Sequence, residues 1–517
     1  MSFADSHYPA SSRHVFASFP QEGGKVRCAK VMADSEPASP TARQSSGRRA
    51  NGGRDLTNGP ITRTLIAFAL PTLGANILQS LNGSVNAIWI GRILGESALA
   101  ATSNSNLILF LMLAAVIGFG IAATILIGQS IGRCDIDSAR RVVGSAAGLF
   151  LASSLLIAAV GYFETPGLLH LLATPGEAMP LALAYLRVIF LSMPAMFIVT
   201  LLGMSLRGTG DSVTPLIWMA VSVVLDVGMN PVLMKGLGPF PAMGIAGSAT
   251  ATAFASYATM VGMLIHVYWR DMPIRLKGPE LRYLIPDPGL LRVIVAKGVP
   301  MMVQMFVMSL SALVMIGLIN REGVVTTAAY GVTSTLWTYI SMPAMAVGTA
   351  VSAMVAQNIG ANRWDRVSRI TKSGIVFSLS VTTSMVVLLA LVDTYALGLF
   401  LSPHSPSLPV ARHIQLLATW SFIMFGITFT LFGTVRANGV VWPAVIILVA
   451  TLIPFRLGIA LFLRPMFGVD ALWLSFPASS FVSMLLAIAY FRYGNWRTAR
   501  LNVPTRGRAS EGLQAQL

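Results

Sequence analysis

The segment GQSIGRCDIDSARR at 128–141 has a second version in the chain, AQNIGANRWDRVSR at 356–369. Gln129 of the first copy aligns with Gln357 of the second, 228 residues later. Each copy follows one long apolar run and precedes another, so the motif recurs at the same place in the pattern. An internal repeat of this length predicts a chain built from two similar halves.

Two further landmarks keep nearly the same offset. Pro71 in ALPTL aligns with Pro300 in GVPMM, and Arg207 in LRGTGDS aligns with Arg436 in VRANGVV, in both cases 229 residues later. We therefore expect two halves that enter the membrane in the same direction and are related by a pseudo-two-fold axis along the membrane normal. Such symmetry is typical of transporters that bind substrate between the halves near the midplane.

The composition is that of a membrane protein. Of 517 residues, 55% are hydrophobic and only 11% are charged, and the mean hydropathy is +0.71. Soluble globular chains carry about 25% charged residues. This deficit excludes a soluble enzyme, a disordered scaffold and a nucleic-acid-binding domain as main interpretations, and the net charge of +16 fits basic loops facing the cytoplasm.

Apolar stretches long enough for a tilted membrane helix recur from Ile61 onward. We expect an all-α membrane protein in which twelve transmembrane helices form two pseudo-symmetric six-helix bundles. The twelve predicted spans are 61–91, 98–130, 139–163, 180–206, 212–236, 244–268, 290–319, 325–357, 367–392, 410–435, 441–463 and 468–491.

The distribution of Lys and Arg predicts the orientation. With both termini inside, the cytoplasmic loops hold 15 of these residues and the opposite loops hold six, and the two tails add thirteen more on the cytoplasmic side. This bias favours cytoplasmic N- and C-termini and an even number of spans. We expect a multi-pass protein of a bacterial inner membrane.

These spans divide the chain into five parts. We expect a disordered cytosolic tail over 1–60, an N-terminal bundle over 61–268, a cytoplasmic linker over 269–289, a C-terminal bundle over 290–492 and a basic cytosolic tail over 493–517. Met32 as the true start remains an alternative.

Enzymatic chemistry has no visible basis. Two cysteines, Cys28 and Cys134, are too few for a disulfide framework or a four-ligand zinc site. No glycine-rich nucleotide-binding motif occurs, and the six histidines show no metal-binding spacing. We therefore expect no enzyme activity, no metal and no cofactor other than a coupling ion, H⁺ or Na⁺.

Several segments resemble the multidrug and toxic compound extrusion (MATE) transporters. They are LPTLGANILQSLNGSVNAIWIGRILGESALAA at 70–101, the two copies of the GQSIG loop, LRGTGDS at 206–212 and NPVLMKGLGPFPAMGIAGSATAT at 230–252. The resemblance covers nearly all of 60–492. It implies two six-helix bundles around a central cavity and export of cationic amphiphilic compounds in exchange for H⁺ or Na⁺.

The chain departs from the family pattern where the coupling chemistry lies. The family often has an Asp fifteen residues after the bend-forming proline of the first helix, and here that position is Asn86. The fifth helix commonly shows Asn-x-x-x-Asp-Pro, whereas this chain has Asp226 and Asn230 exchanged. One branch of the family uses a carboxylate in the seventh helix, where this chain has only Gln304 and Met-rich apolar residues. The coupling residues must therefore be sought afresh.

Asp226 is the one acidic residue that we place deep inside a span. An ionised Asp at the centre of a membrane helix costs about 2.5–3.5 kcal/mol, which favours a functional partner such as a proton or cation. A structural hydrogen bond to a neighbouring helix is the alternative.

Polar residues at helical spacing on three helices predict a hydrated pocket in the N-terminal half, although interhelical packing would also explain them. They are Ser222, Asp226 and Asn230; Asn76, Gln79, Gly83 and Asn86; and Ser248, Thr252 and Ser256.

Other residues have two interpretations each. Pro71 and Pro300 are natural bend points, either hinges or static kinks. Arg456 in the eleventh span either extends toward an interface or holds a charge in the cavity, where it would bind an anionic group. Trp89, Trp337 and Trp473 are expected to be interfacial anchors rather than stacking surfaces for aromatic cations. The pairs Asp137/Arg141 and Asp365/Arg369 predict cytoplasmic latches within their helices.

The sequence thus predicts a monomeric secondary antiporter that exports lipophilic cationic small molecules by alternating access. Its partners would be those molecules and the lipid bilayer, with no nucleic acid. A flippase for lipid-linked saccharide precursors is the alternative, although it would need more cationic residues in the cavity. A structural or receptor-like membrane protein is a third possibility, favoured if Asp226 proves dispensable.

Overall fold

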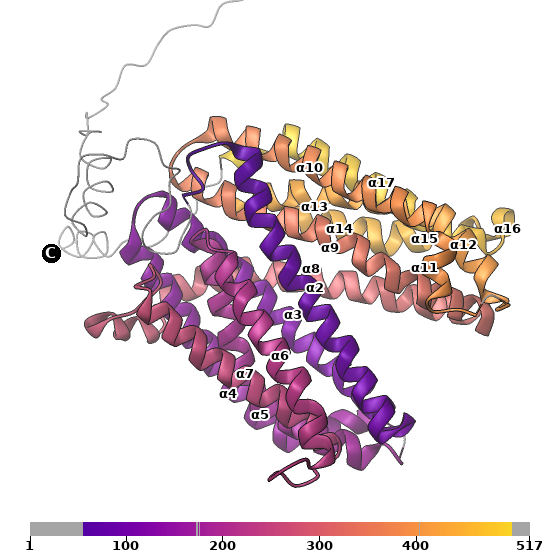
Figure 1. Ribbon diagram of the computed structural model, residues 1–517. Helices are drawn as coiled ribbons and strands as arrows, with labels where there is room; N and C mark the ends of the chain where they lie inside the picture. The colour runs from indigo at the N-terminus through magenta and orange to yellow at the C-terminus, as the bar shows by residue number, and fades with distance from the viewer. Residues whose placement is uncertain (1–54, 172–173, 175, 403, 499–517) are drawn as a thin grey trace, which may run out of the picture. The chain divides into compact units, whose positions relative to one another are not determined.

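The computed structural model describes residues 55–171, 174, 176–402 and 404–498, and these ranges contain helices and no strand. The N-terminal half contains six long helices in chain order (Figure 1): α2 (Ile61–Leu94), α3 (Glu96–Gly132), α4 (Ile136–Leu171), α5 (Met179–Gly208), α6 (Val213–Lys235) and α7 (Ile245–Trp269). The linker that follows contains a short 3-10 helix, η1 (Gly278–Leu284).

The C-terminal half repeats this arrangement with more interruptions. Its long helices are α8 (Pro288–Asn320), α9 (Val324–Gly360), α10 (Trp364–Leu391) and α17 (Asp470–Tyr493). Its shorter pieces are α11 (Asp393–Gly398), α12 (Ser407–Ala418), α13 (Ser421–Ala437), α14 (Trp442–Ala450), the π-helical turn η2 (Thr451–Phe455), α15 (Arg456–Phe462), α16 (Arg464–Phe467) and the terminal 3-10 turn η3 (Asn495–Arg497).

The prediction of twelve membrane-spanning helices is confirmed. Eleven helices of the described residues are long and apolar enough to cross a bilayer, and α12 with α13 forms the twelfth as a pair bent by 45°. Helices suit these apolar stretches because every backbone polar group must be hydrogen-bonded within its own segment when no water is present.

Three spans differ from the sequence prediction. The third continues to Leu171 instead of ending at 163. The tenth is broken between Ala418 and Ser421. The eleventh contains the turn η2 around Pro454, whose missing N–H interrupts the regular hydrogen-bond ladder. Pro454 is visible in the sequence, so this last break could have been predicted.

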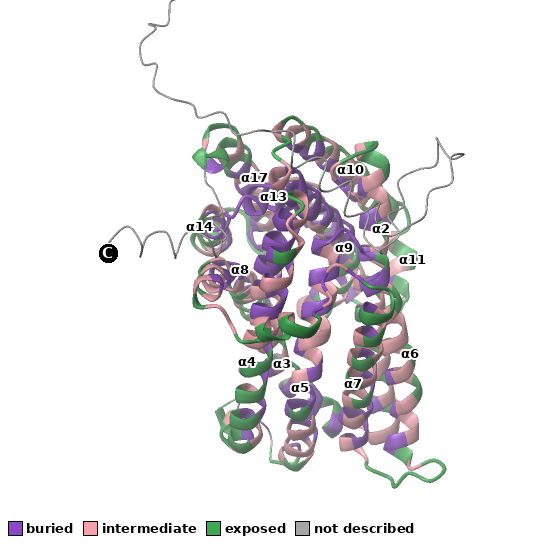
Figure 2. Ribbon diagram, turned by 90° about the vertical axis from the view of Figure 1, so that its left-hand side faces the viewer, coloured by how far each residue is buried: buried purple, intermediate pink, exposed green. Residues whose placement is uncertain are grey.

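The first two helices of each half connect the halves. In the N-terminal half α2 packs against α6 and also against α9, and in the C-terminal half α8 packs against α14 and also against α3. Helices α3 and α9 also pack against each other. Buried residues accordingly concentrate along α9 and α13, whereas α6 and α7 show many partly buried and exposed positions (Figure 2).

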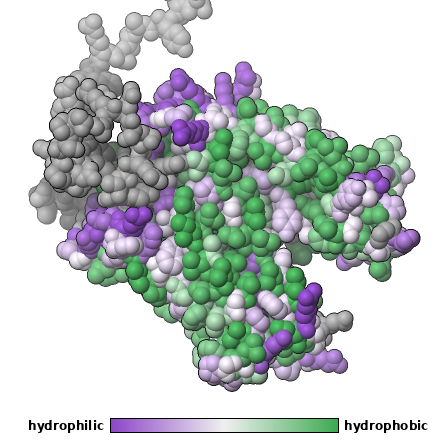
Figure 3. Space-filling model, viewed as in Figure 1, coloured by the Kyte–Doolittle hydropathy of each residue, from purple (hydrophilic) through white to green (hydrophobic). Residues whose placement is uncertain are grey.

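The outer surface is apolar. Large hydrophobic side chains such as Leu156, Phe163, Val224 and Leu416 are at least 65% exposed. Figure 3 shows hydrophobic residues covering the middle of the helices and hydrophilic residues gathered near their ends. An apolar surface this extensive is typical of contact with lipid.

The linker between the halves is held by ion pairs to α4. Arg140 binds Glu280 at 2.6 Å, and Arg141 binds Asp287 at 2.8 Å. Asp137, which the sequence paired with Arg141 inside the helix, accepts a hydrogen bond from the Tyr283 hydroxyl at 2.9 Å. The latch therefore joins α4 to the linker.

Asp287 also begins α8. Its carboxylate accepts hydrogen bonds from the backbone N–H groups of Gly289 and Leu290. Burial opposes ionisation of this group, but the hydrogen bond from Arg141 and the two backbone donors outweigh burial and lower the pKa of Asp287 below its usual value. A carboxylate with a lowered pKa stabilises the fold above its unfolded-state pKa and loses that effect as the pH falls through its folded-state pKa.

We expect Asp287→Ala to lower the free energy of unfolding by about 1 kcal/mol at neutral pH, because α8 loses its N-cap. Thermal unfolding in detergent measures this change. Asp287→Ser, which keeps a capping oxygen without the charge, should lose less. The difference between Asp287→Ala and wild type should shrink as the pH falls below about 4. A pH-independent difference would contradict the role of the ionised carboxylate.

The described residues begin at 55 and end at 498, so they include the inner ends of both predicted tails. Most of 1–60 and 493–517 lies outside the described residues. The described part includes Leu56, which is 0% exposed, and Trp496, which is 1% exposed. The backbone of Leu56 bonds to the side chains of Gln357 and Asn358, and Trp496 stacks on Phe491 with ring centroids 5.1 Å apart. Both belong to one hydrophobic core that contains parts of α3 and α9.

Candidate functional site

A buried carboxylate lies among amides and a hydroxyl in the N-terminal half. Asp226 of α6 is 1% exposed. Its Oδ2 accepts hydrogen bonds from Nδ2 of Asn82, at 2.8 Å, and Nδ2 of Asn86, at 2.9 Å, both on α2. Its Oδ1 accepts one from Oγ1 of Thr252 on α7, at 3.1 Å. Three helices thus meet at one carboxylate, which we call the Asp226 cluster.

Asn230, one helical turn after Asp226, extends the cluster. It is 0% exposed, and its Nδ2 donates to Oδ1 of Asn86 at 3.0 Å. The amide oxygens of Asn82 and Asn230 are buried and have no hydrogen-bond partner among the described residues. Unpartnered buried oxygens are costly, so they indicate a place for a donor or a cation.

The chemistry of this group suits a small hard cation or a proton. Carboxylate and amide oxygens are the ligands that hard cations prefer. The same carboxylate can instead take a proton and donate it to a neighbouring amide oxygen. In the arrangement described, three hydrogen-bond donors point at the Asp226 carboxylate. The site can therefore alternate between a carboxylate held by donors and one that is neutralised.

The sequence predicted this cluster incompletely. Asn86, Asn230 and Thr252 lie in it with Asp226, whereas Gln79 is exposed and its side chain makes no hydrogen bond within the described part of the chain. The same holds for the partly buried side chains of Asn76 and Ser222. Asn82 was missed, although its i, i+4 spacing to Asn86 places both on one face of α2.

The two predicted hinge residues lie inside continuous helices. Pro71 is in α2 and is partly buried, and Pro300 is in α8 and is buried. Both helices continue past their proline, so the described structure contains no break at either point. Their role as hinges stays a prediction.

The repeated loops form a reciprocal contact between the halves. Gln129, near the end of α3, donates from Nε2 to the backbone oxygen of Ala437 at the end of α13, at 2.7 Å. Gln357, near the end of α9, donates from Nε2 to the backbone oxygen of Gly208 at the end of α5, at 3.0 Å. Each glutamine thus satisfies a terminal carbonyl of a helix in the other half. We call this pair of contacts the clasp.

Two glycines allow the clasp to form. A Cβ added at Gly132 would collide with the backbone oxygen of Gln357, and one at Gly360 would collide with the backbone oxygen of Gln129. The ends of α3 and α9 therefore approach each other at backbone distance. Both glutamines are almost fully buried, at 2% and 1% exposed.

The C-terminal half has a charge and an aromatic cluster of its own. Arg456 lies at the start of α15 and donates from Nε to the Ser479 hydroxyl at 2.9 Å. Trp337 and Trp473, expected at a membrane interface, are instead 4% and 1% exposed inside this half. Their burial shows that they pack in the protein core.

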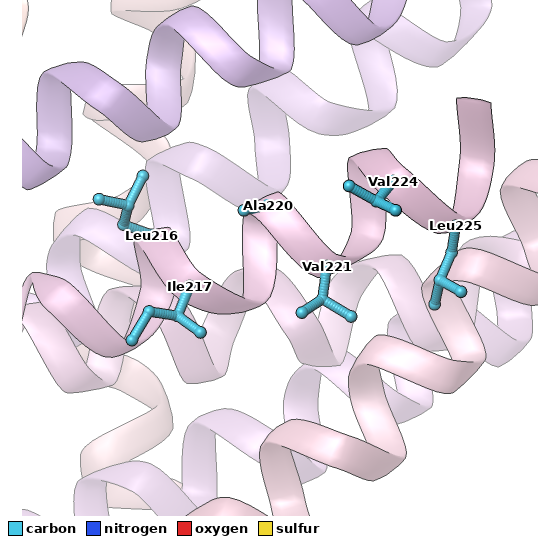
Figure 4. A pocket seen from close by; sticks show the side chains of 6 residues that line it. All are labelled: Leu216, Ile217, Ala220, Val221, Val224 and Leu225. Atoms are coloured by element: carbon cyan, nitrogen blue, oxygen red, sulfur yellow. The ribbon is translucent and has the colours of Figure 1, made fainter. Parts of the chain in front are cut away.

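One open hollow lies on the surface of α6 and is unrelated to these groups. Figure 4 shows its lining, which is entirely apolar: Leu216, Ile217, Ala220, Val221, Val224 and Leu225. A hollow with no polar group, lined by a single helix whose Val224 is 71% exposed, has the character of a lipid-facing surface.

Comparison with known proteins agrees with the repeat and the fold. The MatE family model matches the chain twice, over residues 71–232 and 300–462. The chain belongs to the MATE family. The two matches begin 229 residues apart, at Pro71 and Pro300, as the repeat predicted. This MATE protein is a membrane transporter and not an enzyme.

Curated relatives of this MATE protein match between 65% and 87% of the chain. It is 34% identical over 436 residues to the probable multidrug resistance protein YoeA of Bacillus subtilis, covering 84% of this chain and 94% of that protein. It is 23% identical over 454 residues to the probable multidrug resistance protein NorM of Thermotoga maritima, covering 87% and 96%. It is also 25% identical over 347 residues to an FAD transporter of Shewanella oneidensis, covering 65% and 73%.

Solved MATE structures share the fold. A multidrug resistance MATE transporter of the MOP superfamily in an outward-facing conformation matches with a TM-score of 0.78 at 19% identity, covering 86% of this chain and 97% of that one. A MATE structure in the bent conformation matches with a TM-score of 0.76 at 18% identity, covering 89% and 98%. At these identities the likeness concerns the fold alone.

Proposed function

We propose that this MATE transporter is a secondary antiporter that exports amphiphilic, mainly cationic small molecules in exchange for H⁺ or Na⁺ bound at Asp226. The observation that carries the proposal is the buried carboxylate of Asp226, on which three helices converge beside two unpartnered amide oxygens. The printed names of its relatives, multidrug resistance and multidrug export proteins, support drugs as the substrate class.

Alternating access would use the two halves 61–268 and 290–492 as moving units. The clasp joins them at the end of the bundle where Gln129 and Gln357 lie. The excess of basic residues on the loops at this end supports a cytoplasmic location. With the clasp closed, the site would be reached from outside, and opening the clasp would expose it to the cytoplasm.

Exchange would follow from competition at the Asp226 cluster. An ionised Asp226 attracts a cationic substrate, whereas a bound proton or Na⁺ neutralises the carboxylate and weakens that attraction. Substrate and coupling ion would therefore each expel the other, as thermodynamic linkage between two ligands requires. The inner membrane of a bacterium, with its ion gradients, is the proposed location.

The test uses everted membrane vesicles with an imposed proton gradient. Tetraphenylphosphonium and ethidium are added, and proton release is recorded with a pH-sensitive dye. We expect substrate-triggered release of protons, or of Na⁺ when the vesicles hold a Na⁺ gradient instead. Release under one gradient alone identifies the coupling ion. No release under either gradient would overturn drug antiport and make the flippase the leading hypothesis.

A further inference from the structure

A cation without an ionic partner lies inside the C-terminal half. Arg456 takes part in none of the ion pairs found among residues 55–498 that the structure describes. Its Nε is bonded to the Ser479 hydroxyl at 2.9 Å, and its guanidinium carbon lies 4.6 Å from the ring centre of Phe476. The ring and the hydroxyl fix the guanidinium in one orientation.

Arg456 faces the protein and not the lipid. Leu452 and Ala460, four residues before and after it, are 9% and 0% exposed. Pro454, which is exposed and two residues before Arg456, lies on the other side of the helix. The π-helical turn that ends at Phe455 shifts the register just before Arg456, and such turns occur frequently at functional sites.

The terminal nitrogens of Arg456 are free to bind. Neither nitrogen makes a hydrogen bond among the described residues, and neither is a fully buried atom. A planar guanidinium with two free nitrogens binds a carboxylate or phosphate through two parallel hydrogen bonds. A cation kept inside a membrane bundle without a carboxylate partner is by default a functional group.

Aromatic rings form a wall beside this cation. Tyr330 of α9 stacks on Trp473 with ring centroids 6.0 Å apart, and Trp337 lies 5.3 Å from Phe476. The hydroxyl of Tyr330 makes no hydrogen bond within the described part of the chain, so a donor remains near Arg456. Tyr330, Trp337 and Trp473 are at most 8% exposed, so these rings are packed support beside the cation, and the cation offers the charge.

The parts of this site share one depth in the bundle. Tyr330 lies six residues after the start of α9, Phe476 six after the start of α17, and Arg456 six before the end of α15. At 1.5 Å per residue each is about 9 Å from the same end of the bundle. That end is opposite to the clasp, where α9 ends at Gly360.

We propose that Arg456, with Tyr330, Phe476 and Ser479, is a binding site for the carboxylate or phosphate group of an amphiphilic molecule. The N-terminal half then offers a carboxylate to cations and the C-terminal half a guanidinium to anions, so the substrates include amphiphilic anions. As a substrate site it rests on the proposed transport function. As a binding site it is tested without any ion gradient.

The experiment compares two probes that differ only in their terminal group, the carboxylate of 1-pyrenebutyrate and the neutral hydroxyl of 1-pyrenebutanol. The full chain is placed in nanodiscs of phosphatidylcholine, and binding is followed by energy transfer from tryptophan to pyrene. We expect wild type to bind the carboxylate about tenfold or more tightly than the alcohol, as charge-assisted hydrogen bonds require. Equal affinities in wild type would overturn the proposal.

The variants assign the preference to this site. Arg456→Gln should abolish it and Arg456→Lys should reduce it, because Lys cannot bind bidentately. Ser479→Ala should reduce the preference for the carboxylate a few-fold, because the guanidinium loses the hydrogen bond that fixes its orientation. The control Arg412→Gln removes an exposed arginine of the same half and should retain the full preference. A preference that persists in Arg456→Gln would overturn the assignment.

Lipid headgroups are the other source of an anionic group. If phosphatidylglycerol in the nanodisc displaces 1-pyrenebutyrate from wild type, the site takes lipid and the substrate assignment is wrong. The same titration in Asp226→Asn should show an unchanged preference, because the two groups lie in different halves. Failure of cation antiport would leave this binding result intact, and failure of this binding would leave antiport at Asp226 intact.

Discussion

Replacing Asp226 by Asn should reduce gradient-driven export to the background of empty vesicles while the protein folds as well as wild type. The amide has nearly the shape of the carboxylate, and its oxygen can still accept from Asn82, Asn86 or Thr252. It has no charge, so it can neither take up a proton nor attract a cation. Coupling is lost although the packing is kept.

Stability separates this interpretation from a purely structural one. Burying an ionised Asp in a membrane helix costs about 2.5–3.5 kcal/mol, and the neutral amide avoids most of that cost. We therefore expect the thermal midpoint of Asp226→Asn to equal or exceed that of wild type. A carboxylate needed only for its hydrogen bonds would instead give a less stable variant that still transports.

Glu164→Gln is the matched control, because it removes an exposed carboxylate from α4 in the same half. Its substrate-triggered ion release should equal that of wild type. The proposal for Asp226 fails if Asp226→Asn shows wild-type release of H⁺ and Na⁺. In that case the structural or receptor-like interpretation of the chain gains support.

The sequence predicted the fold well because membrane helices and repeats leave strong local signals. Twelve apolar stretches of sufficient length and a constant offset between landmarks such as Pro71 and Pro300 were enough to define the halves. The break in the tenth span had no such signal, since no proline lies between Ala418 and Ser421. It depends on tertiary packing that a single sequence does not contain.

The site was predicted in part for the same reason. Asp226 is conspicuous because charge is rare inside a span, and Asn86 followed from its spacing to Pro71. Helical spacing alone could not decide which polar residues of α2 face α6, so Gln79 was included and Asn82 was missed. The clasp could not be predicted, because Gln129 and Gln357 bind backbone oxygens, which any residue provides.

Replacing both Gly132 and Gly360 by Ala should lower the transport rate about tenfold or more. Each added Cβ would meet a backbone oxygen of the opposite helix, that of Gln357 or that of Gln129. A helix backbone cannot move aside as a flexible side chain can, so the ends of α3 and α9 must separate. Overpacking of this kind costs about 1–3 kcal/mol at each site.

Separation of α3 and α9 also breaks the two glutamine hydrogen bonds that join the halves. The closed clasp is then disfavoured, and every 1.4 kcal/mol changes the ratio of the closed to the open population tenfold. A transport cycle that needs both arrangements therefore slows. Hydrogen–deuterium exchange measures the change directly. The amides of the last turns of α3 and α9 should exchange faster in the double variant than in wild type.

Gly331→Ala provides the control on the same helix, because a Cβ added there has no atom within 4 Å. It should leave both exchange and transport unchanged, which separates the effect of the clasp from the general effect of adding a methyl group to α9. If the double variant transports at the wild-type rate with unchanged exchange, the close approach of Gly132 and Gly360 serves packing alone. If exchange rises but transport does not fall, the clasp opens without limiting the cycle, and the proposed gate must lie elsewhere.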